Sequence, residues 1–280
     1  MDVDIRKGIE YARHDGAVLV GDLYVPKGTG AHPVVVAVHG GGWQLGTRDS
    51  YRYWGAYLAA RGYALFAPGY RLSKPNEKSY PGAVHDIRAA VQFVKGAGAS
   101  LGLDGARVAL MGDSAGGHLA ALVALAGDHA GFAGAYRDDA HAGVSTKVKA
   151  LIGIYGVYDL VQQWTHDLVP RLRDSICEKF LGSAPLENRR VYFDASPLSY
   201  ATTDNNATAV LLSWGTEDDV VDRLTQSEAF LTALKQARFF ARGVVMQGAG
   251  HFWMSDPIEE PGSYPGHLAP RLLRFLAEKL

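Results

Sequence analysis

The sequence predicts an α/β protein, in which helices cover both faces of a mostly parallel central sheet. Short, continuously apolar segments rich in β-branched residues recur along the chain, and such segments are typical of parallel strands buried on both faces. Segments with the helical spacing of apolar residues separate these strands. Because neither an internal repeat nor an interdomain linker interrupts the alternation, we expect residues 1–280 to form a single domain.

The first two expected strands differ from the others. Residues 5–10 and 17–24 flank the turn His14-Asp15-Gly16, so they are expected to pair as an antiparallel hairpin. The strands expected in the parallel part cover residues 33–38, 63–67, 107–111, 148–154, 210–214 and 243–246. The helices expected between and after them cover residues 51–61, 81–95, 114–126, 224–236 and 268–279.

Two stretches depart from this alternation. Residues 127–147 are rich in glycine and alanine, and residues 159–206 contain a predicted helix over 171–181 together with several turns. Excursions of this length usually serve as functional loops or lids. We therefore expect an insertion after the fifth or sixth strand, at 159–206, that acts as a lid or as a specificity element.

Charge and composition exclude several classes of protein. The 28 Lys and Arg residues balance 29 Asp and Glu residues, so the basic field needed to bind nucleic acid is missing. The single cysteine, Cys177, cannot form an intrachain disulfide, and no Cys/His spacing resembles a zinc site. The first residues lack an apolar segment, and no apolar run reaches about 18 residues. We expect a cytoplasmic protein with no metal, cofactor or membrane partner.

A nucleophile motif follows one of the apolar strands. Gly112-Asp113-Ser114-Ala115-Gly116 fits the pattern Gly-x-Ser-x-Gly and lies between an apolar strand and an Ala/Leu-rich helix. A sharp strand-to-helix turn exposes the serine hydroxyl, and the helix N-terminus favours developing negative charge. Ser114 is therefore a candidate nucleophile, although a tight turn with a capping serine would give the same pattern.

A glycine-rich loop follows the first of the parallel strands. In His39-Gly40-Gly41-Gly42-Trp43, the lack of side chains would let backbone N–H groups approach a substrate oxyanion. A phosphate-binding loop is an alternative, but the chain lacks both Gly-Lys-Ser/Thr and Gly-x-Gly-x-x-Gly after a strand. A plain flexible turn is the remaining alternative.

A serine nucleophile needs a histidine base and an acid that orients it. His251 follows the last expected strand in a glycine-containing loop, whereas His85 and His118 lie in helical patterns and His14 lies in a turn with no evident partner. The order of serine, acid and histidine along the chain is that of the Gly-x-Ser-x-Gly enzymes. His251 is therefore the candidate base.

The acid has several candidates, because Glu217, Asp218, Asp219 and Asp222 all follow the strand at 210–214. Asp218 is the third residue after the glycine that ends this strand, and we select it as the acid. Asp219 is the next candidate.

These motifs together resemble the hormone-sensitive-lipase-like and bacterial carboxylesterase branch of the α/β-hydrolase fold. The resemblance rests on His39-Gly-Gly-Gly-Trp43, Gly112-Asp-Ser-Ala-Gly-Gly117, Gly215-Thr-Glu-Asp218 and Gly250-His251. It implies that Ser114 is the nucleophile, Asp218 the acid and His251 the base. The oxyanion donors implied by the family are the backbone N–H groups of Gly41, Gly42 and Ala115.

The sequence also departs from this family. Only 32 residues precede the strand that leads to His39, which is too few for the helical N-terminal cap of many relatives, and Asp219 replaces the usual proline after the acid. The chain therefore looks similar to the short, capless acetyl- and feruloyl-esterase-like members and to formamidase-like ones. Formamidases tend to carry a bulkier residue where this chain has Gly42, which favours an esterase.

The expected activity is cofactor-independent hydrolysis of a small or medium carboxylic ester through an acyl-enzyme. Trp43, Trp164 and Phe252 are expected to line the substrate pocket, although each could equally pack in the core. An amidase or arylformamidase on the same fold is one alternative. A ligand-binding receptor derived from an inactive hydrolase is another, but the presence of all three candidate catalytic residues argues against it. The sequence predicts no oligomeric state.

Overall fold

The computed structural model describes residues 2–28, 30–172 and 174–280. Within them, eight strands form one sheet in the order β1-β2-β4-β3-β5-β6-β7-β8. The hairpin of β1 (Val3–His14) and β2 (Ala17–Pro26) is antiparallel, β2 also pairs antiparallel to β4, and all later pairs are parallel. The other strands are β3 (His32–Val38), β4 (Ala64–Pro68), β5 (Leu103–Asp113), β6 (Ala150–Ile154), β7 (Ala209–Gly215) and β8 (Ala241–Met246). The predicted α/β class is confirmed.

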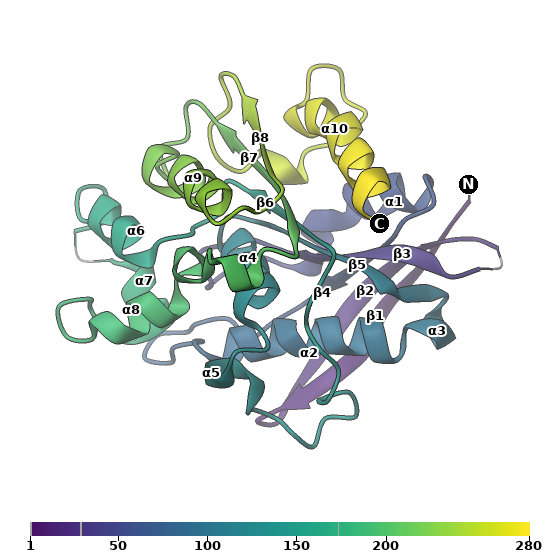
Figure 1. The fold of residues 1–280 in the computed structure, drawn as a ribbon, viewed down its shortest axis with the longest axis horizontal. Helices are drawn as coiled ribbons and strands as arrows, with labels where there is room; N and C mark the ends of the chain where they lie inside the picture. Colours follow the sequence, from purple (N-terminus) through teal and green to yellow (C-terminus); the bar gives the residue numbers. More distant parts are fainter. Residues whose placement is uncertain (1, 29, 173) are drawn as a thin grey trace.

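Helices cover both faces of this sheet (Figure 1). α2, α4 and α9 share one hydrophobic core with one face, while α1 and α10 share another core with the opposite face. The longer helices are α1 (Arg52–Ala59), α2 (Gly82–Gly96), α4 (Ala115–Ala126), α6 (Leu160–Asp167), α9 (Ala229–Gln236) and α10 (Tyr264–Lys279). The short helices are α3 (Gly98–Leu101), α5 (Ala130–Ala133), α7 (Ile176–Leu181) and α8 (Arg189–Ala195). Single helical turns are η1 (Arg48–Tyr51), η2 (Pro197–Tyr200), η3 (Thr203–Asn205), η4 (Leu224–Glu228) and η5 (Trp253–Ser255).

The uninterrupted apolar run of β3 follows from burial on both faces. Side chains alternate along a strand, so Val34, Val36 and Val38 enter the core beneath α2 and α4, whereas Val35 and Ala37 enter the core beneath α1 and α10. All five are at most 1% exposed. Polar residues at alternate positions would therefore have no solvent to face.

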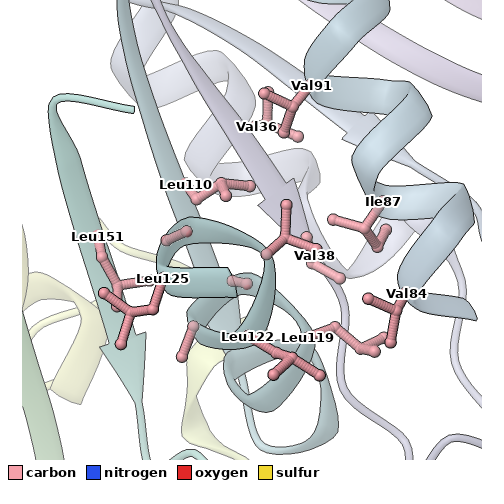
Figure 2. Close-up of a cluster of buried hydrophobic side chains, with 14 of the residues drawn as sticks. Val36, Val38, Val84, Ile87, Val91, Leu110, Leu119, Leu122, Leu125 and Leu151 are labelled. Atoms are coloured by element: carbon pink, nitrogen blue, oxygen red, sulfur yellow. The ribbon is translucent and has the colours of Figure 1, made fainter. Parts of the chain in front are cut away.

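The core beneath α2 and α4 fixes the central strands relative to these helices. Figure 2 shows Val84 and Ile87 of α2 pointing toward Val38 of β3, and Leu125 of α4 next to Leu151 of β6. Because β3 and β5 are neighbouring parallel strands, their carboxyl ends lie at the same edge of the sheet. The loops that leave these two strands therefore begin close together.

Some predicted boundaries differ from the structure. The helix predicted over 171–181 is formed only over Ile176–Leu181, because the Ser175 side chain accepts a hydrogen bond from Glu178 N and caps the helix there; residue 173 lies outside the described residues. The helix predicted over 224–236 begins as a π-helical turn before α9.

The insertion follows β6, the sixth strand along the chain, and leads to β7. Its helices α6, α7 and α8 lie together on the left of the molecule (Figure 1). None of the described helices combines the length and the hydropathy that a membrane-spanning helix requires.

The other stretch that departs from the alternation, residues 127–147, contacts the N-terminal hairpin. His14 is buried and lies between two carboxylates, with Nδ1 2.8 Å from Asp86 and Nε2 2.7 Å from Asp139. The expectation that His14 has no partner is therefore wrong. Its partners lie 72 and 125 positions away along the chain, and local sequence patterns carry no signal for such contacts.

Candidate active site

Ser114 stands at a strained turn between β5 and α4. Its backbone has φ 51° and ψ −122°, a conformation that non-glycine residues adopt only where the surrounding structure enforces it. The two glycines of the motif permit this close packing: an added Cβ would lie 2.2 Å from Gly116 O at Gly112, and 2.0 Å from Val38 O at Gly116. The glycine spacing therefore reflects the approach of the α4 backbone to β5 and β3.

The three predicted catalytic side chains lie within hydrogen-bond distance of one another. His251 Nε2 is 2.9 Å from Ser114 Oγ, and His251 Nδ1 is 2.7 Å from Asp218 Oδ2. The three residues follow β5, β7 and β8, and the carboxyl ends of these parallel strands meet at one edge of the sheet. The side chains of His251 and Asp218 are almost completely shielded from solvent.

Asp218 is held by its own loop. Its second oxygen, Oδ1, accepts hydrogen bonds from Val220 N at 3.0 Å and from Val221 N at 2.9 Å. Asp219 is exposed, and its carbonyl oxygen accepts a hydrogen bond from His166 Nε2 at 3.1 Å. The structure therefore places Asp218, and not Asp219, against His251.

Asp113, which the sequence analysis did not single out, connects the nucleophile turn to the glycine loop. Its Oδ1 accepts hydrogen bonds from Gly40 N at 3.1 Å and from the Tyr51 hydroxyl at 2.9 Å. Burial raises the pKa of Asp113, although these two hydrogen bonds favour the ionised carboxylate and act in the opposite direction. An acidic residue at the end of an otherwise apolar strand was the signal that could have identified it.

The glycine loop folds back on itself beside Ser114. Gly41 has φ 119°, its carbonyl accepts hydrogen bonds from Gln44 N and Leu45 N, and an added Cβ would lie 2.2 Å from Leu45 O. Only glycine fits this turn. Gly41 and Gly42 line the same cavity as Ser114 and Ala115, so the structure brings the predicted oxyanion residues together.

This cavity of about 380 Å³ lies over Ser114. Its lining is mostly apolar, with charged side chains contributed by α7 and by the segment that leads into it. The lining residues are Gly41, Gly42, Trp43, Gln44, Leu45, Ser114, Ala115, Val157, Gln163, Arg171, Asp174, Ile176, Lys179, Val220, Val221 and Phe252. The predicted wall residue Phe252 is among them and is 67% exposed.

The two tryptophans predicted to line the substrate pocket lie in different environments. Trp43 lines the cavity but is fully buried, with its ring stacked 4.6 Å from that of Phe180 and its Nε1 donating to His118 at 3.1 Å. Trp164 does not occur in the described lining, contrary to expectation. Its indole packs toward α7 and donates a hydrogen bond to Glu178 at 2.6 Å.

Comparison with known proteins gives a family match. The model of the BD-FAE family matches residues 21–234. The chain is 30% identical over 211 residues to the probable carboxylic ester hydrolase LipM of Mycobacterium tuberculosis. This alignment covers 74% of this chain and 46% of that protein. It is 31% identical over 249 residues to a probable isoprenylcysteine alpha-carbonyl methylesterase of Oryza sativa subsp. japonica, covering 85% and 55% respectively. The chain thus spans about half the length of these curated relatives.

Solved structures give a longer match. The native and butyrate-bound structures of esterase 2 from Thermogutta terrifontis each superpose on this chain with a TM-score of 0.78 at 26% identity. The match covers 99% of this chain and 92% and 94% of those chains. The fold is therefore that of an α/β-hydrolase esterase along nearly the whole chain.

Proposed function

Because this chain belongs to the BD-FAE family and has the α/β-hydrolase fold, we propose that it is a serine esterase that hydrolyses small to medium carboxylic esters. The observation that carries this proposal is the continuous hydrogen-bonded series from Ser114, which lines the cavity, through His251 to Asp218. The serine would be the nucleophile, the histidine the base and the aspartate the group that orients the imidazole.

The chemistry follows from this order of contacts. His251 Nε2 accepts the proton of Ser114 as Oγ attacks the ester carbonyl, and the imidazolium then donates it to the departing alcohol. Asp218 stabilises the imidazolium and keeps Nδ1 protonated. The backbone N–H groups of Gly41, Gly42 and Ala115 are the proposed donors to the oxyanion. Water activated by the same histidine releases the acid and restores the serine.

The cavity supports the proposed substrate size. A volume of about 380 Å³ accommodates an ester with a short acyl chain and a modest alcohol group, since ligand sites for larger organic molecules extend to about 1,000 Å³. The insertion at 159–206 contributes Gln163 and Ile176 to its wall, which supports a role as a specificity element of a single α/β-hydrolase domain. We also propose a cytoplasmic location and no nucleic-acid or membrane partner, in line with the balanced charge.

Replacement of the nucleophile tests the proposal. Ser114→Ala should lower the turnover of an acetyl aryl ester by about 10⁴-fold to 10⁶-fold, because the acyl-enzyme cannot form. Intact mass spectrometry with a serine-directed phosphonate should give an adduct in the parent protein and none in the variant. Ser100→Ala, at an exposed serine that does not line the cavity, is the control and should retain full activity. An adduct on Ser114→Ala would exclude Ser114 as the nucleophile.

A matched ester and amide distinguish the esterase from an amidase. The proposal expects the ester to be cleaved much faster than the amide with the same acyl group. A kcat/KM for the amide equal to or above that for the ester would replace esterase with amidase as the function.

A further inference from the structure

The inner face of α6 carries polar side chains where a buried helix face would normally be apolar. Leu160, Gln163 and Asp167 are the buried residues of this helix, and Gln163 is 0% exposed. Burying an amide and a carboxylate costs free energy unless their atoms are hydrogen-bonded, yet Gln163 Oε1 and Asp167 Oδ2 have no partner among the described residues. Stability alone would favour apolar residues here.

The amide group of Gln163 contacts the loop that carries the acid. Its Nε2 donates one hydrogen bond to Asp167 Oδ1 and another to the carbonyl oxygen of Val220, both at 3.0 Å. Both partners are acceptors, so the amide orientation is determined: the NH₂ group faces them. The N–H of the same Val220 donates to Asp218 Oδ1. Val220 is thus the single residue that links the Gln163 side chain to the Asp218 carboxylate, the group that orients His251.

A second side chain of α6 is hydrogen-bonded to the same loop. His166 Nε2 donates a hydrogen bond to the carbonyl oxygen of Asp219 at 3.1 Å. The carbonyl groups of two consecutive loop residues, Asp219 and Val220, are therefore held by side chains one helical turn apart on α6.

The N-terminus of α6 is itself tied to the segment that follows the acid loop. Gln226 is buried, its Oε1 accepts hydrogen bonds from Tyr158 N and Asp159 N, and its Nε2 donates to Asp159 O. The start of the insertion thus has a defined position relative to the acid loop, which α6 contacts through Gln163.

From these contacts we infer that Gln163 is a positioning residue for the catalytic acid: by holding Val220, it keeps the Asp218 carboxylate aligned with His251 Nδ1. The inference rests on the proposed function, since it requires that Asp218 orients His251. It assigns the insertion a part in turnover in addition to its contribution to the cavity wall. A misplacement of about 1 Å at a catalytic group costs on the order of 100-fold in rate.

The test replaces the amide by an apolar side chain of similar size. Gln163→Leu should lower kcat for an acetyl aryl ester by about 10-fold to 100-fold and change KM by less than about twofold, because the acid is misaligned while substrate binding is retained. Gln162→Leu is the matched control, since Gln162 is the preceding residue of α6 and is exposed. The control should behave as the parent protein.

A spectroscopic readout separates positioning from a general loss of structure. The proton between His251 Nδ1 and Asp218 should give an isolated far-downfield ¹H NMR resonance in the parent protein and in Gln162→Leu, and it should broaden or disappear in Gln163→Leu. An unchanged resonance together with an unchanged kcat would overturn the inference. An increase in KM alone would also overturn it, because it would make Gln163 only a wall of the cavity.

Two further variants keep the result interpretable. If Gln163→Leu does not fold, His166→Ala removes the contact with Asp219 from a less buried position and should lower kcat by about threefold to tenfold; full activity would count against the inference. If Asp218→Asn is inactive while Gln163→Leu and His166→Ala are both fully active, the proposed function stands and the positioning role fails. Adduct formation on Ser114→Ala would instead refute the function itself.

Discussion

Asp218 and Asp219 are neighbours in the sequence but occupy different environments in the structure. Asp218 contacts His251 and accepts two backbone N–H groups of its own loop, whereas Asp219 is exposed. The difference arises from the direction of each side chain in the turn after β7. A charge count in this acidic stretch could not separate the two residues.

Substitution of each aspartate by asparagine should therefore have unequal effects. Asp218→Asn should lower kcat by about 10⁴-fold, because an amide at this position favours the wrong histidine tautomer, while Asp219→Asn should stay within about twofold of the parent protein. Steady-state kinetics on an acetyl aryl ester measures both. The reverse order of severity would exclude Asp218 as the acid.

At the scale of elements, the insertion is joined to the glycine loop through a buried aromatic contact. Phe180 of α7 stacks on Trp43, and Trp43 donates to His118, whose Nε2 in turn donates to the Ala195 carbonyl of α8 at 2.8 Å. The glycine loop and the insertion therefore share one packed unit. Ile176 of α7 extends this unit to the cavity wall.

Acyl-chain selectivity should depend on this wall. Acetyl to butyryl aryl esters should have a higher kcat/KM than octanoyl esters, because additional methylenes, each worth about 0.8 kcal/mol when buried, find no apolar space. Ile176→Ala should shift the ratio toward hexanoyl or octanoyl esters by about threefold to tenfold. Trp164→Phe, outside the described lining, should leave the ratio unchanged. Equal efficiency of the parent protein on decanoyl esters would contradict the assignment.

At the scale of the whole molecule, two buried histidines make the free energy of unfolding depend on pH in opposite directions. Burial lowers the pKa of His118 to about 4, below its unfolded value of about 6.5. Its contribution is therefore complete above about pH 6.5 and is lost as the pH falls toward 4, because only the unfolded chain binds the proton in that window. The loss amounts to about 3 kcal/mol of the free energy of unfolding.

His14 behaves in the opposite way. Burial lowers its pKa, but the hydrogen bonds to Asp86 and Asp139 and the charges of these carboxylates outweigh burial, so the net shift is upward. Its contribution is complete below about pH 6.5 and is lost as the pH rises through the raised pKa.

Urea unfolding of the parent protein, His118→Gln and His14→Gln between pH 4 and pH 9 measures both effects. The difference in free energy of unfolding between the parent protein and His118→Gln should shrink on acidification. The corresponding difference for His14→Gln should be about 1.5 to 3 kcal/mol below pH 6 and should shrink on alkalinisation. Differences that are constant with pH would show that neither histidine has the protonation state described.

The sequence by itself determined the sheet and the positions of the proposed nucleophile and base. Buried parallel strands require continuous apolar runs, and a strained nucleophile turn requires glycines at close approaches, so both leave strong local patterns. These patterns predicted the class of fold, the strands from β3 to β8 and the positions of Ser114 and His251, which the structure places within hydrogen-bond distance.

Only the tertiary structure decided which side chains form the cavity and how the insertion contacts the acid loop, and it placed Asp218, which its spacing in the sequence had favoured over Asp219, against His251. Each depends on contacts between segments far apart in the chain: Gln163 reaches Val220 across 57 positions, and Asp113 reaches Gly40 across 73. Polar side chains such as these leave no periodic signal, because their partners come from the packing of α6 and β5 and not from the neighbouring residues.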